Sequence, residues 1–113
     1  MINDFSLGKM IIDGISYTGD LKIIQGQVFP NWWRKKGHSV DIEDIRDILR
    51  AEPEFLIIGK GDPGLMQATE HLENILAQKG IKLIQETTPE AIAVYNNLIK
   101  QGTDASAGFH LFC

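Results

Sequence analysis

The sequence has little cysteine and no long apolar run, and both absences narrow the class of protein. Cys113 is the single cysteine among 113 residues, so no disulfide can form within the chain and a reducing compartment is favoured. No apolar run approaches the roughly 20 residues that a helix needs to cross a bilayer. The first five residues lack the basic region and apolar core of a signal peptide and do not resemble a transit peptide. We therefore expect a cytoplasmic protein without a membrane segment.

Positive charge is also in short supply. Eleven Lys and Arg residues stand against 15 Asp and Glu residues, which gives a formal net charge of -4. This balance disfavours a broad surface for nucleic acid or anionic membranes. The content of 43% hydrophobic and 23% charged residues is typical of a globular domain. Since no internal repeat, linker or low-complexity tract interrupts the chain, we expect a single domain over residues 1–113.

Glycines divide the first 40 residues into short β-branched and aromatic runs. These runs are Lys9–Ile12, Ile15–Tyr17 and Leu21–Ile24. Asp13-Gly14, between the first two runs, predicts a tight hairpin because both residue types tolerate a positive φ. Gly19-Asp20 separates the next pair. This half is predicted to form an antiparallel β layer, and its exposed edge leaves a homodimer open.

After residue 40 the apolar pattern becomes helical. Ile42, Ile45, Ile48 and Leu49 share one face of a predicted helix that Asp41 can cap and Pro53 can end. A strand at Phe55 then leads to a helix whose apolar stripe runs from Leu65 to Leu76 and which Gly80 closes. The remaining predicted elements are a strand at Ile81–Ile84, a helix that Thr88 caps and Gly102 ends, and a strand at Ala105–His110.

Strands separated by helices imply right-handed parallel crossovers. The predicted fold class is therefore α/β, with mixed α and β elements. We expect a three-layer domain in which the N-terminal antiparallel β layer packs on a Rossmann-like β-α-β-α-β half.

Three closely spaced glycines follow the apolar run that begins at Phe55. Gly59, Gly61 and Gly64 satisfy the pattern G-x-G-x-x-G, which predicts a strand turning sharply into a helix whose N–H groups bind an anion. Glu86 stands about where a ribose-binding acid is expected. However, Asp62 can cap the helix itself, and too few residues follow for a second mononucleotide half. A structural turn is favoured, while a small-anion site and a nucleotide site stay open.

A second segment, Trp32 to His38, combines two large aromatic rings with Arg34, Lys35 and Lys36. Stacking and positive charge together are how proteins hold single-stranded nucleic acid. The same residues also suit a structural role or a ligand cleft, with the tryptophans packed between the two halves. The acidic balance of the chain favours the second interpretation and makes nucleic acid an unlikely partner.

His38, His110 and Cys113 are the remaining groups with nucleophile or metal-ligand chemistry. A carboxylate beside Cys113, the chain's own terminal one, disfavours a thiolate and hence Cys–His catalysis. The spacing His110-x-x-Cys113 with His38 far upstream lacks the paired ligands of typical zinc sites. The sequence therefore predicts no catalytic residue, no metal site and no cofactor.

Several short motifs in one order resemble a known family. They are Trp33-Arg34 with Gly37-His38, then Leu56 to Gly61, then Thr88 with Ala91 and Tyr95-Asn96, and finally Phe109-His110 with Cys113. The chain resembles the small domain shared by the adipogenesis-associated domain protein and, more distantly, the mitochondrial complex I assembly factor 3. This resemblance implies a compact three-layer domain with a Rossmann-like half and no established enzymatic activity. Its eukaryotic members look like assembly or regulatory factors.

The residues and the resemblance together favour a non-enzymatic binding or assembly domain. We expect a cleft between the glycine turn and the Trp32 to His38 segment that takes a small anionic ligand or a protein segment. Its candidate ligand-binding residues are Trp33, Arg34, His38, Gly59, Lys60 and Gly61. Arg34 would pair with the anion and the turn amides would donate hydrogen bonds to it. The alternative is an enzyme or sensor for a nucleotide or phosphorylated metabolite, with His38 as general acid or base.

Overall fold

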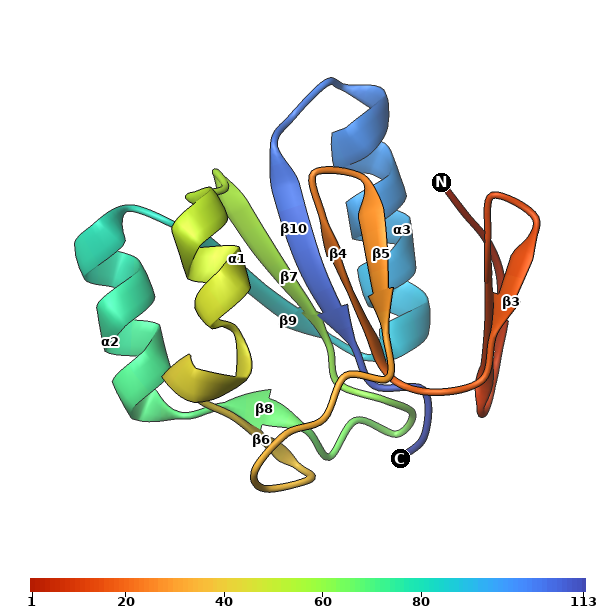
Figure 1. Cartoon of the computed structure of the whole chain (residues 1–113), viewed down its shortest axis with the longest axis horizontal. Helices are drawn as coiled ribbons and strands as arrows, with labels where there is room; N and C mark the ends of the chain where they lie inside the picture. Colours follow the sequence, from red (N-terminus) through yellow and green to blue (C-terminus); the bar gives the residue numbers. More distant parts are fainter.

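The computed structural model describes residues 1–113 and contains ten strands, three α-helices and one 3₁₀-helix (Figure 1). The strands are β1 (Ile2–Ser6), β2 (Lys9–Ile12), β3 (Ile15–Tyr17), β4 (Leu21–Ile24), β5 (Gln27–Pro30), β6 (Ser39–Val40), β7 (Phe55–Gly59), β8 (Gln67–Ala68), β9 (Lys82–Glu86) and β10 (Ala105–Phe109). The helices are η1 (Ile42–Asp44), α1 (Arg46–Ala51), α2 (Glu70–Lys79) and α3 (Thr88–Lys100). None of these helices is long and apolar enough to cross a bilayer.

A five-stranded sheet in the order β5-β4-β10-β7-β9 forms the centre of the molecule. Its β10, β7 and β9 strands are parallel, while β4 is antiparallel to both β10 and β5. A separate antiparallel sheet contains β1, β2 and β3, and β6 pairs with β8 in a short parallel ladder. The predicted mixed α/β class is confirmed, and the N-terminal β segments divide between the first two sheets.

The two faces of the central sheet bury two apolar clusters. Successive residues of a strand point to opposite faces. On β7, Ile57 therefore joins the cluster beneath α3 and the N-terminal sheet, whereas Leu56 and Ile58 join the cluster beneath α1 and α2. Figure 1 shows α3 on one side of the sheet and α1 with α2 on the other. Leu56, Ile57 and Ile58 are fully buried because helices cover both faces.

The N-terminal strand predictions agree with the structure. The three predicted runs have the bounds of β2, β3 and β4, and Asp13 and Gly14 form the hairpin turn with φ values of 49° and 81°. Two positive φ values in a two-residue loop match the right-handed twist of the strands that it connects. The hairpin of β4 and β5 adds to the central sheet instead of packing on it.

The predicted start of the middle helix is wrong. Helix α2 begins at Glu70, where the Thr69 hydroxyl accepts a hydrogen bond of 3.1 Å from the Leu72 N–H, and Gly80 ends it as predicted. Gly61 and Gly64 have φ values of 93° and 110°, which no right-handed helix allows. An irregular loop and β8 therefore separate the glycine turn from the helix, and the turn is not a helix N-terminus.

Of the two other predicted N-caps, the one at Asp41 is confirmed and the one at Thr88 is wrong. Asp41 caps η1, where its carboxylate accepts from the Ile42 N–H and forms a capping box with Asp44. Thr88 was predicted to cap α3, but it lies inside the helix and its hydroxyl bonds elsewhere. The N-cap of α3 is Thr87, whose side chain makes no capping bond.

Candidate functional site

The side chains from Trp32 to Arg34 alternate between the interior and solvent, although the segment is not part of a strand. Trp32 and Arg34 are buried, with 7% and 8% exposed, whereas Trp33 is 79% exposed. The Trp32 Nε1–H donates to the Asp44 carbonyl at 2.9 Å, and its ring contacts the backbone of Gly108 on β10. The Arg34 guanidinium lies 4.6 Å from the centroid of the Trp32 ring, a cation–π contact. The exposed Trp33 therefore stands between two fixed neighbours.

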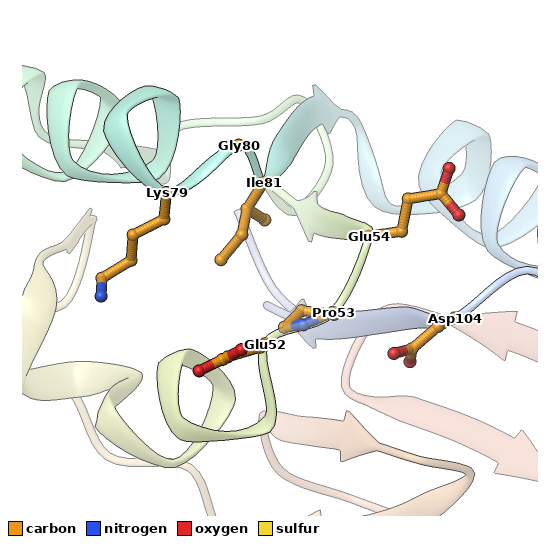
Figure 2. Close-up of a pocket in the computed structure, with 7 residues that line it drawn as sticks. All are labelled: Glu52, Pro53, Glu54, Lys79, Gly80, Ile81 and Asp104. Atoms are coloured by element: carbon orange, nitrogen blue, oxygen red, sulfur yellow. The ribbon is translucent and has the colours of Figure 1, made fainter.

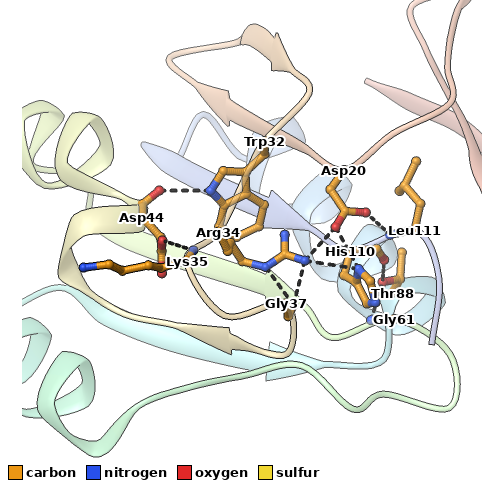
Figure 3. Close-up of polar contacts among 10 residues, drawn as sticks. All are labelled: Asp20, Trp32, Arg34, Lys35, Gly37, Asp44, Gly61, Thr88, His110 and Leu111. Atoms are coloured by element: carbon orange, nitrogen blue, oxygen red, sulfur yellow. Dashed lines mark hydrogen bonds and ion pairs between the residues drawn. The ribbon is translucent and has the colours of Figure 1, made fainter.

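A buried network of Asp20, Arg34 and His110 holds this segment against the end of β10 (Figure 3). Arg34 Nη2 donates to Asp20 Oδ2 at 2.8 Å, while Nη2 and Nε both donate to the Gly37 carbonyl. His110 Nδ1 lies 2.8 Å from the same carboxylate oxygen, and the Leu111 N–H donates to Asp20 Oδ1 at 2.8 Å. Because an ionised carboxylate only accepts, we assign the proton to Nδ1 of His110.

Asp20 is the anion of this network. Burial raises the pKa of its carboxyl group, but the hydrogen bonds from Leu111, His110 and Arg34 lower it more, so the net pKa lies below the ordinary value of 3.8. Asp20 therefore stays ionised at neutral pH and balances the buried charge of Arg34. The side chains of Asp20 and Arg34 are only 11% and 5% exposed.

Two buried nitrogens of the network have no hydrogen-bond partner in the protein. They are Nη1 of Arg34 and Nε2 of His110. Most buried polar atoms in proteins have a partner, so such atoms merit a functional explanation. The His110 ring also contacts the exposed His38 ring edge-on, with 5.5 Å between the centroids. The structure thus brings together Arg34 and His38 of the predicted site.

The glycine turn does not offer its amides to a ligand. The Lys60 N–H donates to the Glu86 carbonyl at 2.9 Å, and the Gly61 N–H donates to the Thr88 hydroxyl at 2.9 Å. The next amide, of Asp62, donates to the carbonyl of Phe112 at 2.8 Å. The expectation that these donors bind an anion is wrong because residues 110–113 lie across the turn and one tail carbonyl accepts from it.

Gly59 and Gly61 nevertheless contact His110, which also lies beside Arg34 and His38. The His110 N–H donates to the Gly59 carbonyl at 2.9 Å. A Cβ on Gly61 would lie 2.7 Å from Cδ2 of His110, so the turn and the imidazole are in direct contact. Gly59 itself is buried, and a Cβ there would lie 2.5 Å from the Phe109 ring. Gly59 and Gly61 therefore support the network, while the backbone of Lys60, between them, bonds to Glu86 and Met66.

The expected cleft between the two segments is not present as a cavity. None of the five cavities is lined by any of the six candidate residues. A cavity of about 470 Å³ lies at the opposite end of the sheet, where residues such as Glu54 and Asp104 precede the strands (Figure 2). Ligands of open α/β sheets bind at the carboxyl ends of the strands, so this cavity has the less favourable place.

Sequence reasoning missed the roles of Asp20 and Thr88. The sequence predicts only that Asp20 lies in a turn between strands and that Thr88 caps a helix. Thr88 is fully buried, and its hydroxyl accepts from Gly61 N–H and donates to the His110 carbonyl at 2.7 Å. No local pattern could reveal these bonds, since each joins residues more than 20 positions apart. Cys113 is exposed, and no group of three His, Cys, Asp or Glu residues is arranged to hold a metal ion.

Replacing Thr88 by valine is expected to destabilise the protein by about 2–4 kcal/mol. Valine has the shape of threonine but leaves the buried Gly61 N–H and His110 carbonyl without their partner. Urea denaturation followed by far-UV circular dichroism measures the loss. Thr87→Val is the matched control, because the Thr87 side chain makes no capping bond, and its effect should stay within about 0.5 kcal/mol. Equal losses in both variants would contradict the assigned role.

The fold and the site define a class of small α/β domain. A mixed five-stranded sheet has helices on both faces, and a separate N-terminal β sheet packs on the face that α3 covers. A buried Asp–Arg–His network lies at the carboxyl end of the parallel strands. The chain belongs to the family described as "Protein of unknown function (DUF498/DUF598)", whose model matches residues 2–110. The expectation of a family without an assigned function is confirmed, whereas the resemblance to the adipogenesis-associated domain protein and the complex I assembly factor stays a prediction.

Solved structures share the same fold over most of their length. The protein MT938 is 27% identical, with a TM-score of 0.83 and coverage of 100% of this chain and 98% of its own. The conserved hypothetical protein PH1505 from Pyrococcus horikoshii OT3 is 20% identical, with a TM-score of 0.84 and coverage of 100% and 99%. A structure named as an outer membrane protein from Bartonella henselae is 23% identical, with a TM-score of 0.84 and coverage of 99% and 94%.

Proposed function

We propose that the chain is a non-enzymatic cytoplasmic binding domain that acts in assembly, the role that its resemblance to eukaryotic proteins implies. Its contact surface is the segment from Trp33 to His38, and its ligand is an acidic segment of a partner protein. Arg34 and the glycine turn hold this surface in place from behind. Gly59, Lys60 and Gly61 thus belong to the candidate site as its support.

The exposure of Trp33 is the observation that carries this proposal. Its side chain is 79% exposed, although the residues on either side of it are buried and bonded. Tryptophan is enriched among the residues that dominate binding energies, because it buries a large area and loses little conformational freedom. A tryptophan that is held outward on a fixed backbone is therefore well suited to enter a pocket of a partner.

The charges around Trp33 favour an acidic partner. Lys36 and His38 are exposed and form no ion pair, and the contact of Lys35 with Glu43 is long, at 3.7 Å. The charge of Arg34 is already balanced by Asp20, so the unpaired positive charge of this segment is that of Lys36. Such a patch attracts a carboxylate-rich peptide and increases its association rate.

Replacing Trp33 by alanine is expected to weaken binding without unfolding the protein. With a library of Glu- and Asp-rich peptides as the probe, the variant should lose about 2 kcal/mol of binding free energy, or roughly 30-fold in Kd. Its free energy of unfolding should change by no more than about 0.5 kcal/mol, since the side chain lies in solvent. Trp32→Ala is the contrasting variant and should cost about 3–5 kcal/mol of stability. Unchanged peptide affinity in Trp33→Ala, or no binding by the wild type, would contradict the proposal.

The two buried nitrogens without partners favour a second candidate, a sensor or enzyme for a nucleotide or phosphorylated metabolite. Nη1 of Arg34 could donate to a phosphate oxygen, and His38 would act as general acid or base. Thermal denaturation with nucleotides, dinucleotides and phosphorylated metabolites separates the candidates. A ligand at 100 times its Kd adds about 2.7 kcal/mol to stability and raises Tm clearly. A shift with one of these compounds supports this candidate, and no shift with any of them counts against it.

A further inference from the structure

Strand β9 is an unpaired edge of the central sheet, remote from Trp33 in the chain. It pairs with β7 alone. The Lys82 N–H donates to the Glu54 carbonyl at 3.0 Å, and the Glu86 carbonyl accepts from Lys60 N–H at 2.9 Å, so both residues direct their backbone toward β7. Successive residues of a strand direct their backbone groups to opposite sides. The N–H and C=O groups of Leu83 and Gln85 therefore face the open edge.

An apolar groove runs along this edge beneath α2. Its volume is about 380 Å³, and it is lined by Glu73, Leu76, Ala77, Ile81, Leu83 and Gln85. Four of these six residues are hydrophobic. The groove leaves room beside β9, and its apolar wall suits the side chains of an added strand.

We propose that β9 pairs antiparallel with β9 of a second copy of this chain, around a two-fold axis at Ile84. In this register Leu83 of one copy lies opposite Gln85 of the other, and the same pair recurs on the far side of the axis. Each pair exchanges two N–H···O bonds, because these are the residues whose backbone faces outward. The two five-stranded sheets become one continuous sheet.

The charges of β9 select both the partner and the register. Lys82 and Glu86 form no ion pair within the chain. In the register centred on Ile84, Lys82 of each copy lies directly opposite Glu86 of the other, and opposite charges in such positions stabilise a sheet. An axis at Leu83 or Gln85 also satisfies the outward backbone groups, but it places an isoleucine opposite a charge. The strand is thus complementary to itself in one register.

The edges in the first half of the chain are less suitable for pairing. Edge strand β5 ends in Pro30, which has no N–H to donate, and edge strand β3 has only three residues. Edge strand β1 has an irregular register between Ile2 and Asp4, and the Asn96 side chain of α3 already bonds the N–H and C=O of Ile2. Proline and short length are common means of preventing edge pairing. The homodimer that the sequence leaves open is therefore assigned to β9. This assignment is independent of the proposed function of Trp33.

Reversal of the two charges tests the pairing. Sedimentation equilibrium at low salt, at concentrations up to roughly 1 mM, should show a weak dimer, because five-residue strands bury less than the roughly 1,200 Å² of a stable interface. Lys82→Glu and Glu86→Lys each place like charges opposite one another twice, and each should raise the dimer Kd about 10-fold. The double variant restores both pairs in reversed order and should return to within about 3-fold of the wild type. Lys79→Glu lies outside the strand and changes the net charge as Lys82→Glu does. This control should leave the dimer Kd unchanged.

Amide hydrogen exchange provides a second measurement that does not depend on the variants. The N–H groups of Leu83 and Gln85 should exchange more slowly as protein concentration rises, whereas those of β5 should not change. A protein that stays monomeric at the highest concentration overturns the proposal. A dimer whose Kd does not change in the single variants, or is not restored in the double variant, also overturns it. So does a dimer in which the N–H groups of Leu83 and Gln85 exchange no more slowly than in the monomer.

Discussion

Replacing Asp20 by alanine is expected to destabilise the protein by about 3–5 kcal/mol, because it removes one partner of a buried ion pair. The change leaves the Arg34 guanidinium buried without a counter-ion and removes the acceptor of the Leu111 N–H. Chemical denaturation monitored by tryptophan fluorescence measures the loss. Asp13→Asn is the matched control, because asparagine also tolerates the positive φ of 49° in the hairpin turn, and the change removes only the charge that Asp13, 69% exposed, pairs with the N-terminus. Exposed pairs contribute only about 0–1 kcal/mol, so the control should remain close to the wild type.

The same carboxylate makes stability depend on pH. The pKa of Asp20 is lower in the folded protein than its ordinary value of 3.8, so the folded state favours the ionised form. Its contribution is complete above that ordinary pKa and is lost as pH falls through the lower, folded-state pKa. The difference in unfolding free energy between the wild type and Asp20→Asn should therefore be constant near neutral pH and narrow below pH 3.8. A difference that stays constant into this acidic range would show that the charge of Asp20 is not what stabilises the network.

Replacing Gly61 by alanine is expected to destabilise the protein by about 3 kcal/mol or more, through backbone strain and overpacking together. Gly61 has a φ of 93°, and a Cβ would lie 2.4 Å from the Phe112 carbonyl oxygen and 2.9 Å from the Cys113 carbonyl carbon. These neighbours are backbone atoms, so the tail must move away from the turn. Thermal and urea denaturation measure the change in stability.

Gly80→Ala separates strain from overpacking. Gly80 also has a positive φ, of 72°, but no atom lies within 4 Å of its Cβ position. Its replacement should cost only the strain, about 1–2 kcal/mol. If both variants lose the same free energy, the tail is not packed on the turn as the structure has it. If Gly61→Ala loses more, faster amide exchange of Asp62 should accompany it, because this N–H donates to the displaced Phe112 carbonyl.

The elements that the sequence predicted well are those set by neighbouring residues. Strand β2 and its hairpin follow from β-branched residues and from Asp13-Gly14, which act over a few positions. The loop after Gly59 could not be predicted in this way. Its conformation depends on bonds to the tail, such as that between Leu65 N–H and the Cys113 carbonyl at 2.8 Å. Glycines that look like a phosphate-binding turn instead make room for a segment almost 50 residues away.

The site shows the same limit. The sequence Trp32-Trp33-Arg34 does not reveal that the arginine is buried and that one of the two tryptophans is exposed. The hydrogen-bond partners of Arg34 could not be predicted from the sequence, because Asp20 lies 14 positions before it and His110 lies 76 positions after it. A buried arginine requires a counter-ion, but the sequence offers 15 acidic residues and no local rule to choose among them.

The contact between Trp32 and Gly108 links the outer surface to the most enclosed part of the sheet. Strand β10 lies between β4 and β7, and a Cβ on Gly108 would lie 2.7 Å from the Trp32 ring, so the indole rests on the strand backbone. A loop that is anchored in this way loses little conformational entropy when a partner docks, which leaves more of the contact energy for affinity.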